Sequence, residues 1–493
     1  MKSISLWSAL LLSACAVGPN YKPPAAPQTP GYAAPAAASP TASAPTPGGE
    51  AQRFADGRDI PGEWWTLFQS PQLNQLIERG LANNPTIDAA QAALRQANEA
   101  MAAQRGAFYP SVSGQYQAQR AKESGAELGQ PQLGSILYTL NTATVNVSYT
   151  LDAFGGIRRQ VEALQAQAEY QRFALEASYL TLTANIVTAA VGEASLRAEI
   201  AATEDIVRLE RAELDITRRR VSAGGASQAD VLQQQAVLDA TLAGLPALRS
   251  QLAQERNLLA AYVGEYPADY AGAAFTLDSL QLPVDLPLSL PSKLVEQRPD
   301  IQEYAALLHQ ATAQIGVATA NLLPQLTLSG SYGGAASRFS DVFSPSSVVW
   351  SLIGGVTQPL FKGGQLTHQR RAAVAAAQQA AANYRSTVIT AFQNVSDTLY
   401  ALQADADTLA AQSEALGTAD GALKLVQAQY KSGGASNLQV LTSEQAYQNA
   451  VIALVKARAQ RLADTAALFQ ALGGGWWNRT DLAESTDCCK GSK

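Results

Sequence analysis

The sequence predicts an α+β membrane protein in which short β-hairpins alternate with very long coiled-coil helices. Three observations lead to this prediction: the chain contains an internal twofold repeat, several segments alternate apolar and polar residues, and long stretches repeat apolar residues every seven positions. Alternating strands can face lipid on one side and water on the other, and a sustained seven-residue period is typical of a left-handed coiled coil.

Residues 1–14 have the layout of a secretory signal peptide, because Lys2 precedes a short apolar core that ends in small residues. The run Leu12–Cys15 matches the bacterial lipobox, in which the thiol of Cys15 receives a diacylglycerol and the freed amine is acylated. Several acyl chains together anchor a protein stably. An ordinary signal peptide with an incidental cysteine is the alternative. Ala16, where inner-membrane lipoproteins usually have Asp, favours the outer membrane.

Composition argues against several classes of function. The net charge is −6, from 41 acids against 35 bases, so no basic excess points to nucleic acid. His309 and His368 are the two histidines, and they form no cluster with cysteine that would bind a metal. We therefore expect no enzyme, no metal and no cofactor apart from the lipid on Cys15. The adjacent Cys488 and Cys489 in the polar tail suggest no function.

The chain reads as two copies of one unit. At an offset of 214, Pro85, Ile87, Ala92, Leu94 and Ala97 match Pro299, Ile301, Ala306, Leu308 and Ala311. Further on, AFGG matches LFKGG and AGGASQADVL matches SGGASNLQVL. The predicted domains are a lipidated N-terminal tether (15–60), a first repeat (61–263), a linker (264–292), a second repeat (293–473) and a C-terminal tail (474–493).

Each repeat contains one predicted strand hairpin, at about 109–152 and about 324–360. Strands of about ten residues suit a tilted crossing of a bilayer. A small soluble sandwich with its apolar face inward is the alternative. In lipid, four strands cannot close a barrel, because the smallest bacterial barrels need about eight. Two copies of the chain would give a filled barrel, and three copies would leave an open bore.

Long helices follow each hairpin. A seven-residue series comprises Val374, Ala381, Val388, Val395, Leu402, Leu409, Leu416, Leu423 and Tyr430. Shorter series run through 200–221 and 231–259 in the first half. At about 1.5 Å per residue, a helix of about 65 residues is about 100 Å long. The turns VSAGGAS and YKSGGAS interrupt the helices, so we expect strands at one end of each repeat and these glycine turns at the other.

These residues resemble the outer-membrane factor family, the TolC-like channels of Gram-negative bacteria. The similarity is greatest to the lipoprotein branch typified by OprM and NodT, which serves resistance–nodulation–division efflux pumps. CAVGPNYKPP, GEWWTLFQSPQLNQLIERGLANNP and EQRPDI carry it, and the match covers nearly all of residues 12–473. The resemblance implies a homotrimer with a twelve-stranded barrel in the outer membrane and a helical tunnel in the periplasm. It also implies a periplasmic adaptor and an inner-membrane transporter as partners.

The resemblance further implies a passive duct with a gate at the tips of the helix hairpins. The tip turns are Gly224, Gly225, Gly433 and Gly434. The constriction is expected at Leu438, Gln439 and Thr442. The family has acidic residues here, and this chain has an amide and a hydroxyl, so we do not expect the family's cation selectivity. We predict an Asp230–Tyr430 hydrogen bond that holds the tips closed; the alternative is that Asp230 only caps the helix after Ser227.

Two other functions share parts of this pattern. The duct of a type I protein secretion system would have the same fold. A lipid-anchored coiled-coil scaffold in the periplasm would share the anchor and the helices, but would not need strands with two faces. The lipobox and the lipoprotein-branch motifs favour small-molecule efflux.

Overall fold

The computed structural model of the chain describes residues 16–29, 31, 32, 39–126, 129, 132 and 134–479. The expected signal peptide, the lipid-bearing Cys15 and the cysteines at 488 and 489 lie outside the described residues. Two compact units divide the chain. The first contains the residues up to Pro24, Ala93–Gln171 and Tyr304–Tyr384, and the second contains Ala25–Ala92, Arg172–Glu303 and Arg385–Lys493.

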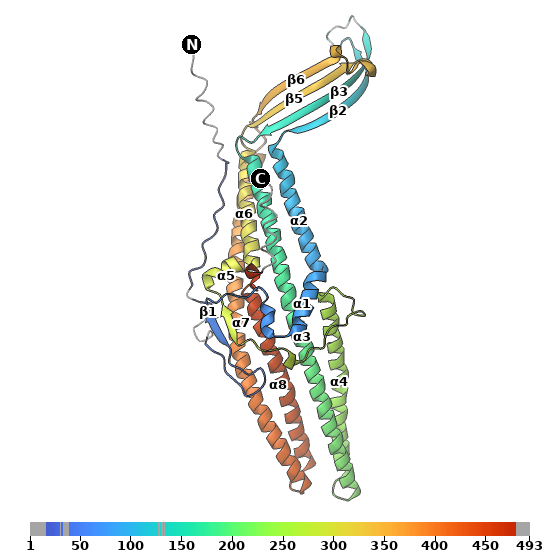
Figure 1. Ribbon diagram of the computed structural model, residues 1–493, viewed down its shortest axis with the longest axis vertical. Coiled ribbons are helices and arrows are strands. Elements are labelled where there is room, and N and C mark those ends of the chain that lie inside the picture. The colour runs from blue at the N-terminus through green and yellow to red at the C-terminus, as the bar shows by residue number, and fades with distance from the viewer. Residues whose placement is uncertain are drawn as a thin grey trace. The chain divides into compact units, whose positions relative to one another are not determined.

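The same order of elements occurs twice along the chain (Figure 1). The first half contains β1 (Arg53–Asp56), α1 (Pro71–Asn83), α2 (Pro85–Arg105), β2 (Ser111–Ser124), β3 (Ser135–Leu151), α3 (Gly156–Ser222) and α4 (Gln228–Tyr262). The second half contains β4 (Asp285–Leu288), α5 (Pro291–Gln297), α6 (Pro299–Ala320), β5 (Gln325–Ala336), β6 (Val348–Thr357), α7 (Gln365–Lys431) and α8 (Asn437–Ala471). Helices α3 and α7 both have 67 residues, and α4 and α8 both have 35.

The repeated prolines explain where two of the helices begin. Asn84, between α1 and α2, and Arg298, between α5 and α6, are extended, with ψ of 121° and 122°. The ring of a following proline disfavours the helical conformation at such a residue, while proline itself fits the first position of the next helix. Pro85 and Pro299 therefore end one helix and start another at equivalent points of the two halves.

A four-stranded antiparallel sheet, in the order β2-β3-β5-β6, dominates the first unit. Its register aligns apolar residues across every strand. One row runs through Val112, Val147, Gly330 and Leu352, and the next runs through Gly114, Val145, Tyr332 and Trp350. Because side chains alternate along a strand, the rows between them bring serine, threonine and glutamine to the opposite face.

The apolar face of this sheet is not covered by the protein. Val112, Leu352 and Trp350 are 67%, 70% and 73% exposed. The soluble sandwich considered from the sequence is therefore wrong, because a sandwich buries its apolar face against a second sheet. An exposed apolar face of this extent marks a surface that is covered by another molecule or by lipid.

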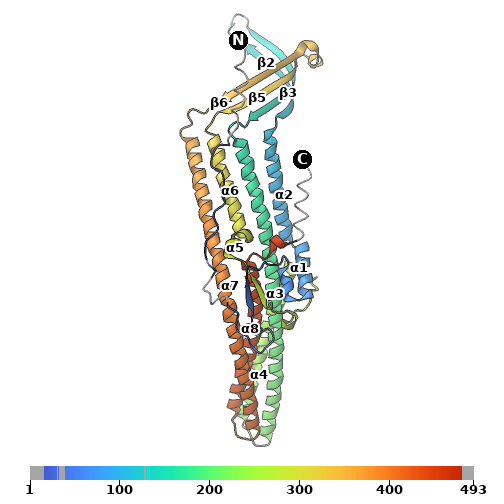
Figure 2. The same cartoon turned by 60° about the vertical axis from the view of Figure 1, so that its left-hand side comes forward.

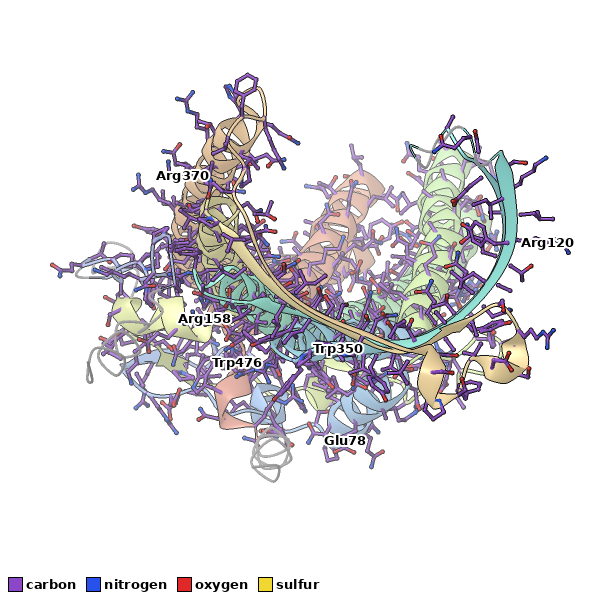
Figure 3. The ribbon with its side chains drawn as sticks, turned by 90° about the horizontal axis from the view of Figure 1, so that it is seen from above. Glu78, Arg120, Arg158, Trp350, Arg370 and Trp476 are labelled. Atoms are coloured by element: carbon purple, nitrogen blue, oxygen red, sulfur yellow. The ribbon has the colours of Figure 1, made fainter. Side chains whose placement is uncertain are left out.

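The sheet also has two open edges. Each of β2 and β6 pairs with one neighbour among the described residues, so each leaves one row of backbone N–H and C=O groups unpaired by the sheet. Figure 3 looks down on the strands and shows the sheet curved as an arc, with Arg120 marked on β2 and Trp350 on β6. The curvature and the open edges are what one segment of a larger barrel would show.

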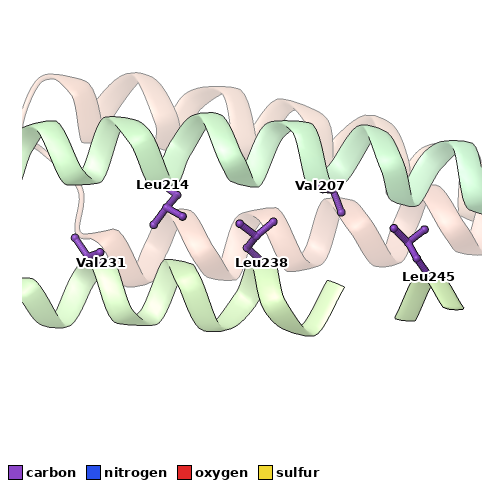
Figure 4. Close-up of a cluster of buried hydrophobic side chains, with 5 residues drawn as sticks. All are labelled: Val207, Leu214, Val231, Leu238 and Leu245. Carbon is purple, nitrogen blue, oxygen red and sulfur yellow. The ribbon is translucent and has the colours of Figure 1, made fainter. Parts of the chain in front are cut away.

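The second unit is built around the long helices, whose seven-residue series form the buried seam. Val207 and Leu214 of α3 pack against Val231, Leu238 and Leu245 of α4, and all five are at most 8% exposed (Figure 4). The corresponding series on α7 is also buried from Val388 to Leu409. Figures 1 and 2 both show the α3–α4 turn and the α7–α8 turn at the same end of this unit.

One described helix, α3, contains an 18-residue window with a mean hydropathy of 1.2, which is apolar enough to cross a membrane by composition. Half of that window is buried inside the protein, as in the core helix of a soluble bundle. The window is therefore weak evidence for a membrane-spanning helix.

The helical seam predicts unequal effects of two similar substitutions on α4. Replacing the buried Leu238 with alanine should cost about 2–5 kcal/mol, because it leaves a cavity between α3 and α4. The same change at Leu232, which is 63% exposed, should cost less than about 0.5 kcal/mol. Hydrogen exchange of the α3–α4 amides measures both, and equal effects would show that the seam lies elsewhere.

Candidate functional site

Both helix hairpins turn in the same way at their tips. Gly224 and Gly433 have φ of +78° and +84°, a left-handed conformation that glycine adopts without a steric penalty. The next glycines donate their N–H groups back to the helix, Gly225 to the carbonyl of Arg220 and Gly434 to that of Gln429, both at 2.8 Å. These bonds satisfy carbonyls that the helix end would leave free.

The helices that leave the tips begin with matching capping boxes. Ser227 and Asp230 exchange side-chain to backbone hydrogen bonds at the start of α4, and Ser436 and Gln439 do so at the start of α8. Donation from the backbone N–H of Ser227 to its carboxylate, followed by donation from the Ser227 hydroxyl, holds the pKa of Asp230 below its usual value. Each tip therefore satisfies its own backbone.

The predicted Asp230–Tyr430 hydrogen bond is wrong. The Asp230 carboxylate accepts from Ser227 at 2.8 Å, and the Tyr430 hydroxyl is buried without a hydrogen-bond partner in the described chain. The alternative, a capping role for Asp230, is what the structure shows. A carboxylate held in a short local turn is not free to reach a tyrosine on another helix.

A different residue, Arg220, connects the two tips. Its guanidinium lies 4.0 Å from the centre of the Tyr430 ring, and it donates a hydrogen bond to the Tyr430 carbonyl at 3.2 Å. An arginine over an aromatic ring is attracted by the ring's negative face. Arg220 was missed in the sequence because its contact depends on how α3 and α7 are rotated relative to each other.

The expected constriction residues lie on the solvent side of the first turns of α8. Leu438 is 66% exposed, and the Thr442 hydroxyl donates to the Leu438 carbonyl at 2.8 Å. The Gln439 amide oxygen accepts from the Ser436 N–H at 2.7 Å, so this side chain caps the helix. The structure thus brings the three residues together, with the amide of Gln439 committed to its own helix.

Three buried glutamates lie among the four helices above the tips, and the sequence analysis did not identify them. They are Glu210 and Glu213 on α3 and Glu444 on α8, with exposures of 1%, 9% and 4%. A signal was present, because Glu210 follows the core residue Val207 by three positions and Glu213 follows the core residue Ile206 by seven. Acids at these spacings fall on the buried face of a coiled coil.

The segment that follows Cys15 is held in the first unit by Arg159. This buried side chain donates to the Val17 carbonyl at 3.1 Å and to the Asn20 side chain at 2.6 Å, and it pairs with Glu162 at 2.6 Å. Val17 also donates its N–H to the Phe154 carbonyl, in the turn that follows β3. Residues 17–20 are therefore fixed beside the end of a strand.

Close backbone approaches explain two glycines at this point. A Cβ on Gly18, whose φ is +91°, would lie 2.5 Å from the Cα of Gly316, and one on Gly155 would lie 2.5 Å from the Cα of Ala16. Tyr21 stacks on His309 with ring centres 4.4 Å apart. Cys15 itself is outside the described residues, but its Cα can be only about 3.8 Å from that of Ala16.

Within the described ranges, no group of three or more histidine, cysteine, aspartate or glutamate side chains is arranged to hold a metal ion. The chemistry of the site therefore rests on hydrogen bonds, charges and packing between helices.

Comparison with known proteins shows similarity along the whole chain. Residues 76–265 and 290–474 match the sequence family described as outer membrane efflux protein. The chain is 31% identical over 491 residues to the pyoverdine export outer membrane protein OpmQ of Pseudomonas aeruginosa, covering 97% of each. It is 30% identical over 484 residues to the toluene efflux pump outer membrane protein TtgC of Pseudomonas putida, covering 97% of this chain and 96% of TtgC.

A solved structure shows the same fold. The outer-membrane channel OprN superposes on 94% of this chain with a TM-score of 0.86 and 26% sequence identity, and all of the OprN chain is covered.

The contact between the tips predicts opposite results for two substitutions. Arg220→Gln should speed hydrogen exchange at residues 219–224 and 429–434 by about 2- to 30-fold, because it removes a cation–π contact of about 0.5–2 kcal/mol. Tyr430→Phe should change little, because it keeps the ring and removes a hydroxyl that has no partner. Arg219→Gln is the matched control, since Arg219 pairs with Asp215 on its own helix. A large effect of Tyr430→Phe would restore a hydrogen-bonded lock.

Proposed function

The chain belongs to the outer membrane efflux protein family and is an outer-membrane efflux channel, and from this premise we propose that it works as a homotrimer with a twelve-stranded barrel. The observation that carries this proposal is the four-stranded sheet with an exposed apolar face and two open edges. In hydrocarbon, each unpaired backbone group costs several kcal/mol, so the edges must be paired by another chain.

The strand order allows identical copies to close the sheet. Because β2, β3, β5 and β6 alternate in direction, β6 of one copy can pair antiparallel with β2 of the next without interrupting the alternation. A head-to-tail contact of this kind generates a ring when the rotation closes. Three copies give twelve strands, which is above the number at which side chains fill the bore.

In the proposed assembly the helices of three copies form a tunnel in the periplasm, and the hairpin tips form its gate. An adaptor protein and an inner-membrane transporter complete the tripartite pump. The chain itself holds no machinery for energy coupling in this proposal, so the transporter drives the flux and this protein conducts it passively. No cofactor is needed apart from the lipid.

We also propose that Cys15 carries that lipid. The support comes from residues 16–21, which Arg159 and the close glycine contacts hold beside the end of β3. A cysteine one residue earlier would deliver its acyl chains to the membrane next to the strands. Two of the three expectations for this end of the chain, the signal peptide and the acylation, fall on residues outside the described range and stay predictions.

Small-molecule efflux is favoured over the other functions considered. A periplasmic scaffold would not need the exposed apolar sheet. OpmQ and TtgC are named for pyoverdine export and for toluene efflux, and neither name refers to protein secretion. We therefore propose small molecules as the cargo.

Currents across a planar bilayer test the channel and its constriction together. The wild type should give discrete channel currents, and native mass spectrometry should give the mass of three chains. Thr442→Asp should raise the cation-to-anion permeability ratio at least about fivefold, because a carboxylate attracts a cation about 4 Å away by about 1 kcal/mol even in water. Thr442→Asn is the neutral control. A monomer that conducts nothing would overturn the proposal.

Acylation has a test with a control inside the chain. Intact mass spectrometry of the mature wild type should show Cys15 as the first residue with a diacylglyceryl group and an amide-linked acyl chain. Cys15→Ser should lose this added mass, and Cys488→Ser should keep it. An unmodified Cys15 in the mature chain would contradict the anchor.

A further inference from the structure

The three buried glutamates, Glu210, Glu213 and Glu444, lie where the two helix pairs meet. One pair is α3 with α4, and the other is α7 with α8. Each glutamate accepts a hydrogen bond from an amide on the opposite pair. Gln448 of α8 donates to Glu210, Gln427 of α7 donates to Glu213 at 3.1 Å, and Gln234 of α4 donates to Glu444 at 3.4 Å. We call these three glutamates the carboxyl clasp.

The clasp is not neutralised by a matching set of bases. From α4 the facing groups are the Thr241 hydroxyl, which donates to Glu210 at 2.9 Å, and the amide of Gln234. From α7 they are Gln427 and Lys431, whose positive charge acts on Glu213. Oxygens of Glu210 and Glu444 are buried without a hydrogen-bond partner in the described chain. Ionising all three would therefore place two or more uncompensated charges inside the bundle.

Burial shifts the protonation of all three groups in the same direction. It raises the pKa of Glu444 to about 7, and the negative charges of Glu213 and Glu210 raise it further. Burial also raises the pKa of Glu210 against hydrogen bonds from Thr241 and Gln448, and it raises that of Glu213 against Lys431. A protonated carboxyl is neutral, and it can itself donate one of the hydrogen bonds that are unmade here.

We propose that the carboxyl clasp is a proton-sensitive contact between the two helix pairs, which holds the tips closed when protonated and releases them when ionised. This proposal rests on the proposed function, because it treats the separation of the pairs as the opening of the channel. The clasp lies next to the Arg220–Tyr430 contact, on the same two helix pairs, so both contacts must break for the pairs to separate.

The sign of the pH effect follows from the difference between the closed and open states. In the open state the Glu444 carboxyl is solvated and has an ordinary pKa of about 4.3. In the closed state its pKa is about 7. The closed state therefore loses stability as the pH rises from about 4.3 to about 7, and no more is lost above that. Each unit of difference changes the equilibrium tenfold, so the open-to-closed ratio should rise on the order of 100-fold.

Single-channel recordings between pH 4.5 and 8.5 test the clasp. The open probability of the wild type should rise across the lower half of this range and level off above about pH 7. Glu444→Gln should remove most of this rise, and Glu210→Gln combined with Glu213→Gln should remove the rest, because the amides stay neutral at every pH. Asp215→Asn is the control, since Asp215 is exposed on the same helix and pairs with Arg219. It should behave like the wild type.

A distance measurement keeps the clasp testable without conduction. Spin labels at Ala223→Cys and Ser432→Cys, in a chain with Cys488→Ser and Cys489→Ser, report the separation of the two tips. The distance should lengthen or broaden between pH 5 and pH 8 in the wild-type background and stay constant with Glu444→Gln. Tips that move without any current would retain the clasp and refute the channel. A current with the same pH dependence in Glu444→Gln, or tips that never move, would overturn the clasp.

Discussion

The structure depends on a sheet that cannot satisfy itself. Four strands place valine, tyrosine, leucine and tryptophan in aligned rows on one face, and no part of the protein covers that face. Two strand edges are also left open. In water such a sheet would aggregate through its edges, and in lipid it would leave backbone groups without partners. Closure with identical copies removes both problems, and it fixes the remaining design, because every helix that follows a strand must then stand beside its equivalents in a ring.

The helices combine two kinds of contact with different strengths. Inside the α3–α4 hairpin, Leu238 and its neighbours form an apolar seam that is almost completely buried. Between the two pairs, the contacts named above involve amides, carboxyls and one guanidinium over a ring. Burying a well-packed leucine stabilises by a few kcal/mol, while a neutral hydrogen bond contributes about 0.5–1.5 kcal/mol. A hairpin of this kind therefore stays intact under a load that separates it from its neighbour.

The fold was accessible from the sequence, and much of the tip was not. Alternation predicted the strands and the seven-residue series predicted the seams, because both patterns report which face of an element is buried. The Asp230–Tyr430 bond failed because a local competitor, the N–H of Ser227 three residues away, was stronger than any distant partner. Arg220 and the carboxyl clasp depend on the rotation of one helix against another, which no local pattern records. Arg159 depends on a segment more than 100 residues earlier in the chain.

The tips show why local satisfaction and distant contact are separated. Each tip has its own glycine turn and its own capping box, so all of the backbone bonds of a turn lie within one hairpin. Moving one hairpin away from the other breaks none of them. What is lost is the Arg220–Tyr430 contact and the amide–carboxyl bonds, and water can replace these groups' partners once the surfaces part. A gate built in this way opens by rigid motion of folded hairpins, and the cost of opening is set by the few polar groups between them rather than by the stability of the helices.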